Sequence, residues 1–430
     1  MSVGLATAGF LLMLAMMLTS IPIAVSMFVV GAGGGLLAFG APFLDSMASV
    51  LWSVQDENLL TSIPLFVLLG ELLLRSGIAD EMYETLAAWL GRLPGGLLHT
   101  NIGCCALFAA TSGSSVATAA TIGTVALPSL QQRRYPMRQA LGSIAAGGTL
   151  GILIPPSINM IVYGSLTNQS IGKLFIAGII PGILLTLCFM TFIAVDAILK
   201  DESRHETLPP LRERIRLLRR LVPPAIVFGI VMGSLYFGIA TATESAALGV
   251  VTALFFTWRT GRLSLSLLQA CFLQTARISG MILLIIAAAF ILNLLISLTG
   301  VAEAMTKWVT SLGLTGTTML LVLIVFYLVL GMFMDVLSMQ VATIPITYPI
   351  VTALGVDPIW YGIFIVLMCE LGLITPPVGM NLFVVHGIRP DRGGIQDAIW
   401  GALPYAVIMI LFTLLLMAFP GLATWLPAKM

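Results

Sequence analysis

The sequence has 430 residues, of which 59% are hydrophobic and 9% are charged, and its formal net charge is +1. Charged residues make up roughly a quarter of an ordinary soluble protein, so this composition excludes a soluble globular fold. Successive apolar stretches of about 17–25 residues match the hydrocarbon core of a bilayer and predict an all-α polytopic membrane protein. The sequence contains no basic, aromatic-rich patch of the kind that binds nucleic acid.

The first predicted elements are two apolar helices, a semi-polar loop through Asp56 and Glu57, and a third apolar helix. The segment 78–92 follows, with apolar side chains on one face and acidic ones on the other. That pattern is typical of a helix lying in the membrane interface. The three apolar helices are expected at about 3–19, 21–39 and 59–76.

Two short apolar segments come next, and neither is long enough to span a bilayer comfortably. They flank the polar residues 111–115, so we expect a re-entrant hairpin with a polar tip. A helix at about 137–166 then contains Pro155 and Pro156 near its middle. The proline pair removes two N–H donors and clashes with the preceding turn, so the helix must open there. The two hairpin arms are expected at about 97–110 and 116–130.

The middle of the chain contains four predicted helices and the most charged stretch, residues 200–220, which is expected to form a cytoplasmic loop. An amphipathic segment at 301–312 then begins a second unit. It leads to a second hairpin with its tip at 333–338. The helices of the middle and the last helix are expected at about 172–199, 222–239, 242–258, 277–298 and 401–419, and the second hairpin's arms at 316–332 and 339–353.

A second broken helix at about 359–386, interrupted by Pro376 and Pro377, completes a repeat of the first unit. Gly77 and Ser112 are 35 residues apart, as are Gly300 and Asp335, which pairs Asp335 with Ser112. Two broken helices at matching places in two halves are the best sequence indication of a transporter's binding site.

The positions of Lys and Arg predict the orientation in the membrane. If the loop with Arg133 and Arg134 is cytoplasmic, all 20 basic residues fall on that side except Lys173, Lys307 and Lys429. Ten crossings then place both termini outside, and the two hairpins enter from opposite sides. The repeats are therefore predicted to be inverted, as in many secondary transporters.

The tip of the first hairpin is rich in hydroxyl groups. They supply oxygens for a cation, Gly113 permits close backbone approach, and helix N-termini attract anions. Alternatively, these side chains only cap two half-helices or join neighbouring ones. We predict Na⁺ ligands at Ser112, Gly113, Ser114 and Ser115, and substrate contacts at Thr111 and Ser115.

Asp335 lies in the tip of the second hairpin. A carboxylate in mid-membrane costs roughly 2.5–3.5 kcal/mol on insertion scales, and the apolar parts of the hairpins contain no Lys or Arg to pair with it. A bound Na⁺, with Ser338 nearby, is the predicted compensation. A helix cap and a protonated carboxyl are the alternatives.

The two breaks supply unpaired carbonyls for an ion, and their half-helix N-termini face an anionic group. Because the predicted cleft contains no basic residue, anion recognition is expected to rest on dipoles and hydroxyls. Among the remaining acidic residues, Glu71 and Glu370 could pair with polar groups or relay protons, and Glu244 is expected to cap a helix. The breaks add ion ligands at Pro155, Asn159, Thr375, Pro376, Gly379 and Asn381, and cleft residues at Pro156, Ser157 and Pro377.

These features together resemble the large permease subunit (DctM family) of tripartite ATP-independent periplasmic (TRAP) transporters, in the ion-transporter superfamily. The resemblance covers nearly the whole chain and rests on residues 111–115, 148–159, 238–247 and 372–381. Ala242 departs from the family motif, which usually has Pro there. The resemblance implies no enzyme activity and no cofactor besides Na⁺ as the coupling ion.

What the resemblance implies is sodium-driven import of an organic acid, such as a C4-dicarboxylate, sialic acid or another sugar acid, across a bacterial inner membrane. It implies two partners, a periplasmic substrate-binding protein and a separate four-helix membrane subunit. It also implies an elevator motion of a transport domain against a scaffold. The transport domain would comprise 97–166 and 314–387, the scaffold 1–77, 170–298 and 395–430, and the arms 78–92 and 301–312.

Other functions fit parts of the pattern. A single-component sodium/carboxylate symporter would need no binding protein. A cation/proton antiporter would titrate Glu71, Asp335 or Glu370 and move no organic solute. An intramembrane serine hydrolase based on Ser114 lacks a histidine placed to act as its base, and paired inverted hairpins disfavour a channel.

Overall fold

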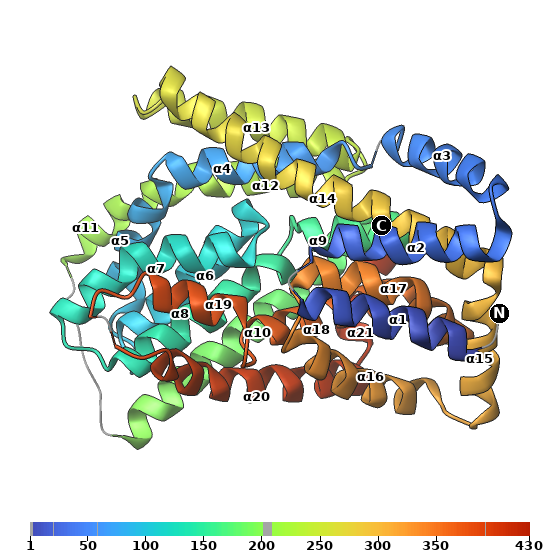
Figure 1. Ribbon diagram of the computed structural model, residues 1–430. Coiled ribbons are helices and arrows are strands. Elements are labelled where there is room, and N and C mark those ends of the chain that lie inside the picture. Colours follow the sequence, from blue (N-terminus) through green and yellow to red (C-terminus); the bar gives the residue numbers. More distant parts are fainter. Residues whose placement is uncertain (1–2, 20, 58, 201–208, 392) are drawn as a thin grey trace.

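The computed structural model describes residues 3–19, 21–57, 59–200, 209–391 and 393–430, and helices are the only regular secondary structure in these ranges. The predicted all-α fold class is confirmed. Figure 1 shows the helices gathered into one bundle, with segments from the two halves of the chain next to one another.

The first helices lead to a sharp bend after α4. The chain turns by 65° between α4 and α5, where Gly77 has a φ of 75°. The sequence predicted an amphipathic helix at 78–92, and α5 buries Ile78 and Met82 on its apolar face. These helices span Val3–Leu18 (α1), Ile23–Phe39 (α2), Ser62–Arg75 (α4) and Ile78–Leu90 (α5).

A further helix, α3 (Pro42–Gln55), occupies much of the segment expected to be a semi-polar loop. It begins at a proline, whose missing N–H would have no helical partner in the first turn. Asp45 lies in that same turn, where a carboxylate interacts favourably with the helix dipole. The loop prediction is wrong because it relied on long apolar runs, whereas α3 mixes apolar and polar residues.

The hairpin and the broken helix of the first half are both present. α6 ends at Ser112 and α7 begins at Ser115. Gly113 between them has a φ of 62°, which glycine adopts without a steric penalty. α8 and α9 lie on either side of the first proline pair. The helices span Leu97–Ser112 (α6), Ser115–Gln132 (α7), Met137–Leu153 (α8) and Ile158–Thr167 (α9).

The middle of the chain contains the longest helices. α14 begins twelve residues earlier than the predicted 277–298 helix. The expected loop at 200–220 is partly outside the described residues, at 201–208, and its remainder includes the short helix α11. The elements span Ile171–Leu199 (α10), Leu211–Leu217 (α11), Leu218–Leu221 (η1), Val222–Tyr236 (α12), Ala242–Arg259 (α13) and Leu265–Thr299 (α14).

The second half repeats the order of amphipathic helix, hairpin and broken helix. The chain bends by 116° between α15 and α16. The second proline pair separates α18 from α19. The elements span Val301–Ser311 (α15), Gly316–Gly331 (α16), Val336–Ala353 (α17), Pro358–Leu373 (α18), Met380–Gly387 (α19), Gln396–Ala418 (α20), Gly421–Thr424 (α21) and Pro427–Lys429 (η2).

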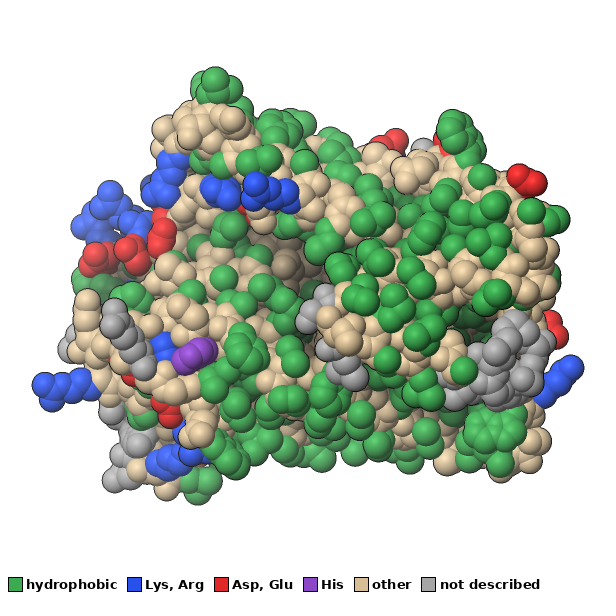
Figure 2. Space-filling view, in the orientation of Figure 1, with side chains coloured by type: hydrophobic (Ala, Val, Ile, Leu, Met, Phe, Trp, Pro, Cys, Tyr) green, Lys and Arg blue, Asp and Glu red, His purple; other side chains and the backbone are tan. Residues whose placement is uncertain are grey.

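The described chain has the lengths and apolarity of a multi-pass membrane protein. Five spans are long and apolar enough to cross a bilayer, or seven if the bent pairs α4–α5 and α15–α16 each count as one. Figure 2 shows hydrophobic side chains over the middle of the visible face and most of its Lys and Arg side chains toward one end. The ten-crossing topology and the inversion of the repeats stay predictions.

Two groups of helices pack around different centres. α8 packs against α6, α7 and α20. Its crossing with α20 is close enough that a Cβ on Gly401 would lie 2.0 Å from the carbonyl oxygen of Arg138, and one on Gly142 would lie 2.2 Å from that of Gly401. α4, α12, α13 and α14 form a second group, along one side of the bundle in Figure 1.

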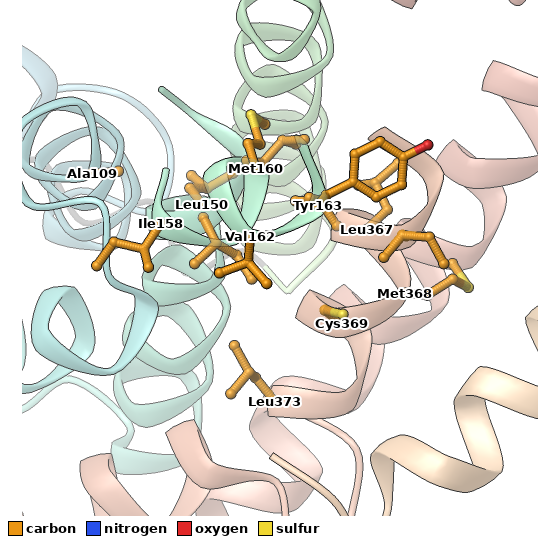
Figure 3. Packing of buried hydrophobic residues seen from close by; sticks show 14 of the residues in the cluster. Ala109, Leu150, Ile158, Met160, Val162, Tyr163, Leu367, Met368, Cys369 and Leu373 are labelled. Carbon is orange, nitrogen blue, oxygen red and sulfur yellow. The ribbon is translucent and has the colours of Figure 1, made fainter. Parts of the chain in front are cut away.

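Buried aromatic and aliphatic side chains join α9 to α18, one helix from each half. The Tyr163 ring lies 6.3 Å from that of Tyr361 and 6.2 Å from that of Tyr348. Its hydroxyl donates to the carbonyl of Pro358 at 2.6 Å, and Figure 3 shows Tyr163 beside Leu367. The two broken helices therefore share one hydrophobic core.

A charged cluster ties the end of α19 to the start of α20. Arg389 donates to both carboxyl oxygens of Asp391 at 2.6 and 2.8 Å, and to Asp397 at 3.0 Å. These hydrogen bonds hold the pKa of the Asp391 carboxyl below its usual value. The guanidinium is almost fully buried, so the cluster fixes the turn between the two helices.

Replacing Gly401 with Val tests the α8–α20 crossing. The added side chain meets the backbone of Arg138, which cannot move without shifting α8, so we expect a loss of about 1–3 kcal/mol, as in other overpacked cores. Thermal melting of the detergent-solubilised protein measures the effect. Gly280→Val is the matched control, because a Cβ at Gly280 meets nothing within 4 Å. Equal melting temperatures for the two variants would show that the crossing is not this tight.

Candidate functional site

Residues from both hairpin tips line a single cavity of about 930 Å³. The first tip contributes Ser114 and Ser115, and the second contributes Asp335. Asn159, just beyond the first break, also faces this cavity, and α4 and α14 form the opposite wall. Figure 2 shows a hollow in the visible face, in the region where these helices lie in Figure 1. The structure thus places predicted site residues from both halves around one space.

The first tip lies directly against the first break. A Cβ on Gly113 would be 2.8 Å from the carbonyl oxygen of Pro156, and one on Gly151 would be 2.7 Å from that of Ser114. A glycine at each contact lets backbone approach backbone. The first tip and the first break therefore pack as one unit, which is the arrangement that a Na⁺ site between them would need.

The hydroxyls of the first tip are engaged with the surrounding helix ends. Ser112 and Thr118 share a hydrogen bond of 2.9 Å, and Ser114 caps α7 by accepting from the N–H of Ala117 at 3.4 Å. Thr111 donates to Phe108 and borders a different, apolar cavity beside α10 and α12. Thr111 is therefore not in the central cavity where the substrate prediction placed it.

Asp335 is the N-cap of α17. Its carboxylate accepts from the N–H of Ser338 at 3.2 Å and from the Ser338 hydroxyl. Ser114 has the same role at the start of α7, and 221 residues separate Ser114 from Asp335, as they separate Pro155 from Pro376. The pairing of Asp335 with Ser112 is thus wrong by two positions. The spacings from Gly77 and Gly300 mislead because the second unit has two residues fewer than the first between its glycine and the residue that caps the second helix of its hairpin.

Asn381 connects the second break to the first hairpin. Its side-chain amide donates to the Ser115 hydroxyl at 2.9 Å and to the carbonyl of Ala145 at 3.1 Å. Ser115 in turn donates to the carbonyl of Gly148 at 2.9 Å. The Oδ1 atom of Asn381 is buried without a hydrogen-bond partner among the described residues. It is therefore a free acceptor at the junction of the two halves.

The two breaks differ in exposure. Ser157 caps α9 and is buried like the first proline pair, whereas Pro377 of the second break is exposed. A backbone hydrogen bond of 3.3 Å from Val378 to Met332 joins the second break to the turn of its own hairpin. Both Pro–Pro peptide bonds are cis. The central cavity is not lined by the following predicted site residues: Ser112, Pro155, Pro156, Ser157, Ser338, Thr375, Pro376, Pro377, Gly379 and Asn381.

The wall opposite the tips contains three polar residues, two of them charged, that the sequence did not rank as site residues. Glu71 and Arg75 from α4 and Gln274 from α14 line the cavity. The expectation that the cleft contains no basic residue is wrong: Arg75 ends an apolar helix and was expected at the membrane surface, but it lines this cavity. A Glu and an Arg four residues apart share one helix face, and this spacing was the available signal.

Glu370 lies away from the cavity in α18. Its side chain is fully buried, and neither carboxyl oxygen has a hydrogen-bond partner among the described residues. Glu244, by contrast, forms a capping box with Thr241 at the start of α13. The cap predicted for Glu244 is confirmed, and Glu370 keeps the two roles that the sequence left open.

A helical membrane protein whose two hairpin tips and two broken helices contribute to the lining of one cavity is built as a transporter. A family model of the tripartite ATP-independent periplasmic transporter, DctM component, matches residues 10–422. The chain belongs to this family, as the resemblance of its motifs implied, and it is a transporter rather than an enzyme.

Individual proteins agree with this assignment. The chain is 36% identical to the C4-dicarboxylate TRAP transporter large permease protein DctM of Pseudomonas aeruginosa, over 92% of this chain and 93% of the relative. It is 28% identical to the sialic acid TRAP transporter large permease protein SiaM of Vibrio cholerae, over 86% and 87%. The Alcanivorax borkumensis YdaH transporter has a similar fold, with a TM-score of 0.67 over 97% of this chain and 99% of that one, at 13% identity.

Gly113→Ala tests the contact between the first tip and the first break. The left-handed backbone costs an alanine about 1–2 kcal/mol, and the methyl group would also press on the carbonyl of Pro156. We expect a loss of transport in addition to a lower melting temperature. Gly261→Ala is the control, since Gly261 has a φ of 71° and a Cβ there meets nothing within 4 Å. Transport by Gly113→Ala equal to that of Gly261→Ala would contradict the contact's role.

Proposed function

We propose that this chain is the large permease subunit of a sodium-driven importer of an organic acid. The observation that carries the proposal is the single cavity shared by Ser114, Ser115, Asn159 and Asp335, because it joins oxygen ligands, helix N-termini and a carboxylate in one space. Relatives named for C4-dicarboxylate and for sialic acid both act on carboxylic acids. We therefore assign the substrate to that chemical class.

Sodium is the coupling ion in this proposal. A hard cation prefers oxygen ligands, and Na⁺ between a tip and its break would offset the charge of Asp335 and use the carbonyls freed by proline. The free Oδ1 of Asn381 supports a second position near Ser115. Without Na⁺, Asp335 repels an anionic substrate, which couples the binding of ion and acid.

The moving unit in the proposed elevator is larger than the transport domain predicted at 97–166 and 314–387. α20 crosses α8 in direct backbone contact at Gly142 and Gly401, and α10 packs against α6, α8 and α18. Helices packed this closely move together more readily than they slide. We therefore assign α10 and α20 to the moving unit. α4 also contacts α6, but it packs more extensively against α13 and α14, so we assign it to the scaffold together with α2, α12, α13 and α14.

The partners follow from the tripartite family. We propose that a periplasmic binding protein delivers the acid, that a small membrane subunit packs against the scaffold, and that the complex lies in a bacterial inner membrane with both termini in the periplasm. The exposed apolar surface of α13 and α14, which includes Val251 and Leu284, supports a membrane-embedded scaffold. A single-component symporter would differ in transporting without a binding protein.

Asp335→Asn tests the ion site without removing a helix cap. Asn caps helices as well as Asp does, so the fold should remain, while the charge that attracts Na⁺ is lost. In proteoliposomes containing all three components, we expect the Na⁺ concentration for half-maximal uptake to rise about tenfold or more. A tenfold rise corresponds to a loss of about 1.4 kcal/mol in the free energy of Na⁺ binding.

Asp357→Asn is the matched control for this experiment. Asp357 caps α18 by accepting from the N–H of Trp360 at 2.8 Å, and it does not line the central cavity. Uptake by the Asp357→Asn variant should depend on the Na⁺ concentration as uptake by the unmodified complex does. An unchanged sodium dependence in Asp335→Asn would remove Asp335 from the ion site, and uptake by the unmodified complex without a sodium gradient would refute the proposed coupling.

A further inference from the structure

The segment that leads into α12 is the most arginine-rich part of the sequence. Residues 211–221 comprise α11 and η1, and they continue without a break into α12. The segment contains a single carboxylate, Glu213, beside five arginines: Arg212, Arg214, Arg216, Arg219 and Arg220. It therefore has a strong net positive charge.

Two of the five arginines are held against the amphipathic helix α5. The guanidinium of Arg214 lies 4.5 Å from the centroid of the Trp89 ring, and Arg220 forms an ion pair with Glu84. The backbone of the segment is held as well, because Nε1 of Trp89 donates to the carbonyl of Arg214 at 3.2 Å. The segment and α5 are thus fixed to one another.

The other three arginines point away from the protein. Arg212, Arg216 and Arg219 are exposed, and none of them forms a hydrogen bond or an ion pair with another described residue. They are four and three residues apart, so they share one helix face. Figure 2 shows Lys and Arg side chains gathered at the end of the bundle where Figure 1 places α11. Three guanidinium groups on one face are therefore available to anions.

An apolar stripe runs beside these three arginines. Its members are exposed, lie three or four residues apart and extend from α11 to the middle of α12: Leu211, Ile215, Leu218, Val222, Ile226 and Ile230. Each of the first three immediately precedes one of the exposed arginines. In a membrane protein such a stripe faces lipid, because contact of aliphatic side chains with water is unfavourable. The arginines therefore lie where the lipid-facing side of α12 continues into residues 211–221.

We propose that residues 211–221 bind anionic phospholipid, with the apolar stripe against the acyl chains and the three exposed arginines on the phosphate groups. Clusters of basic residues next to a membrane helix attract anionic headgroups, and a guanidinium binds a phosphate through two parallel hydrogen bonds. A phosphate ion in solution would leave the stripe uncovered, so the lipid satisfies both features. Because α5 is fixed to this segment, the bound lipid also holds α5 at the membrane surface.

Hydrogen–deuterium exchange of the purified membrane complex tests the proposal, in nanodiscs of phosphatidylcholine and in nanodiscs of equal parts phosphatidylcholine and phosphatidylglycerol. We expect the backbone amides of 211–221 to exchange about tenfold or more slowly in the anionic nanodiscs, since lipid bound to the folded helix opposes its opening. Each arginine near an anionic surface contributes about fivefold. Arg212→Gln combined with Arg216→Gln should therefore remove most of the difference, and Lys at both positions should keep most of it.

The matched control is Arg133→Gln combined with Arg134→Gln. It also removes two exposed arginines, from the turn between α7 and α8, and it should leave the exchange of 211–221 unchanged. Inorganic phosphate added to the phosphatidylcholine nanodiscs should have no effect. If the Gln variant melts at a lower temperature than the unmodified complex, the Lys variant and the two lipid compositions decide instead.

Three results would overturn the proposal. Exchange that is equally fast in both kinds of nanodisc would show that the segment binds no anionic lipid. Exchange that is equally slow in both would show that a protein partner covers it. Slowing by inorganic phosphate alone, or an equal loss in the Arg133 and Arg134 control, would show that the site is not one for lipid at residues 211–221.

Discussion

Each proline pair leaves carbonyl groups of its helix without their helical donors, and a hairpin turn packs against each of these breaks. In lipid, unpaired backbone is tolerated only where protein or a polar cavity surrounds it. The first break is therefore buried against a hairpin whose turn contains Gly113, since a larger residue would collide with the carbonyl of Pro156. The position of the hairpin places its polar turn next to the unpaired backbone groups of the break.

The same constraint joins the two halves. Asn381 follows the second break, yet its amide donates to Ser115 and Ala145 of the first half, and Tyr163 of α9 packs against Tyr361 of α18. The broken helices are thus held by one another as well as by their own hairpins. The cavity between the tips is polar at the helix starts and is bordered on its other side by α4 and α14.

Much of this arrangement could be predicted from the sequence. The proline pairs, the short apolar segments and the amphipathic stretches have local signatures, so the hairpins, breaks and α5 appear at the expected residues. α3 has no long apolar run and was missed. The pairing of Asp335 with Ser114 depends on where each turn closes, which only the capping geometry reveals.

What the sequence could not provide is which side chains share a space. Arg75 is the last residue of an apolar helix, and its place on the cavity wall depends on how α4 packs against the first tip. Thr111 is only three positions from Ser114, which lines the central cavity, but Thr111 faces another cavity. Both outcomes depend on the rotation of a helix within the bundle, which periodicity alone does not determine when the helix is apolar on most sides.

The most direct test of this account is an experimental density map of the complete complex with Na⁺ and the acid delivered by its binding protein. The account predicts density for the acid in the cavity between Ser114 and Asp335, with ions against the tips and breaks. Acid density in the cavity lined by Arg138 and Trp400 instead, with the central cavity filled by lipid, would contradict it.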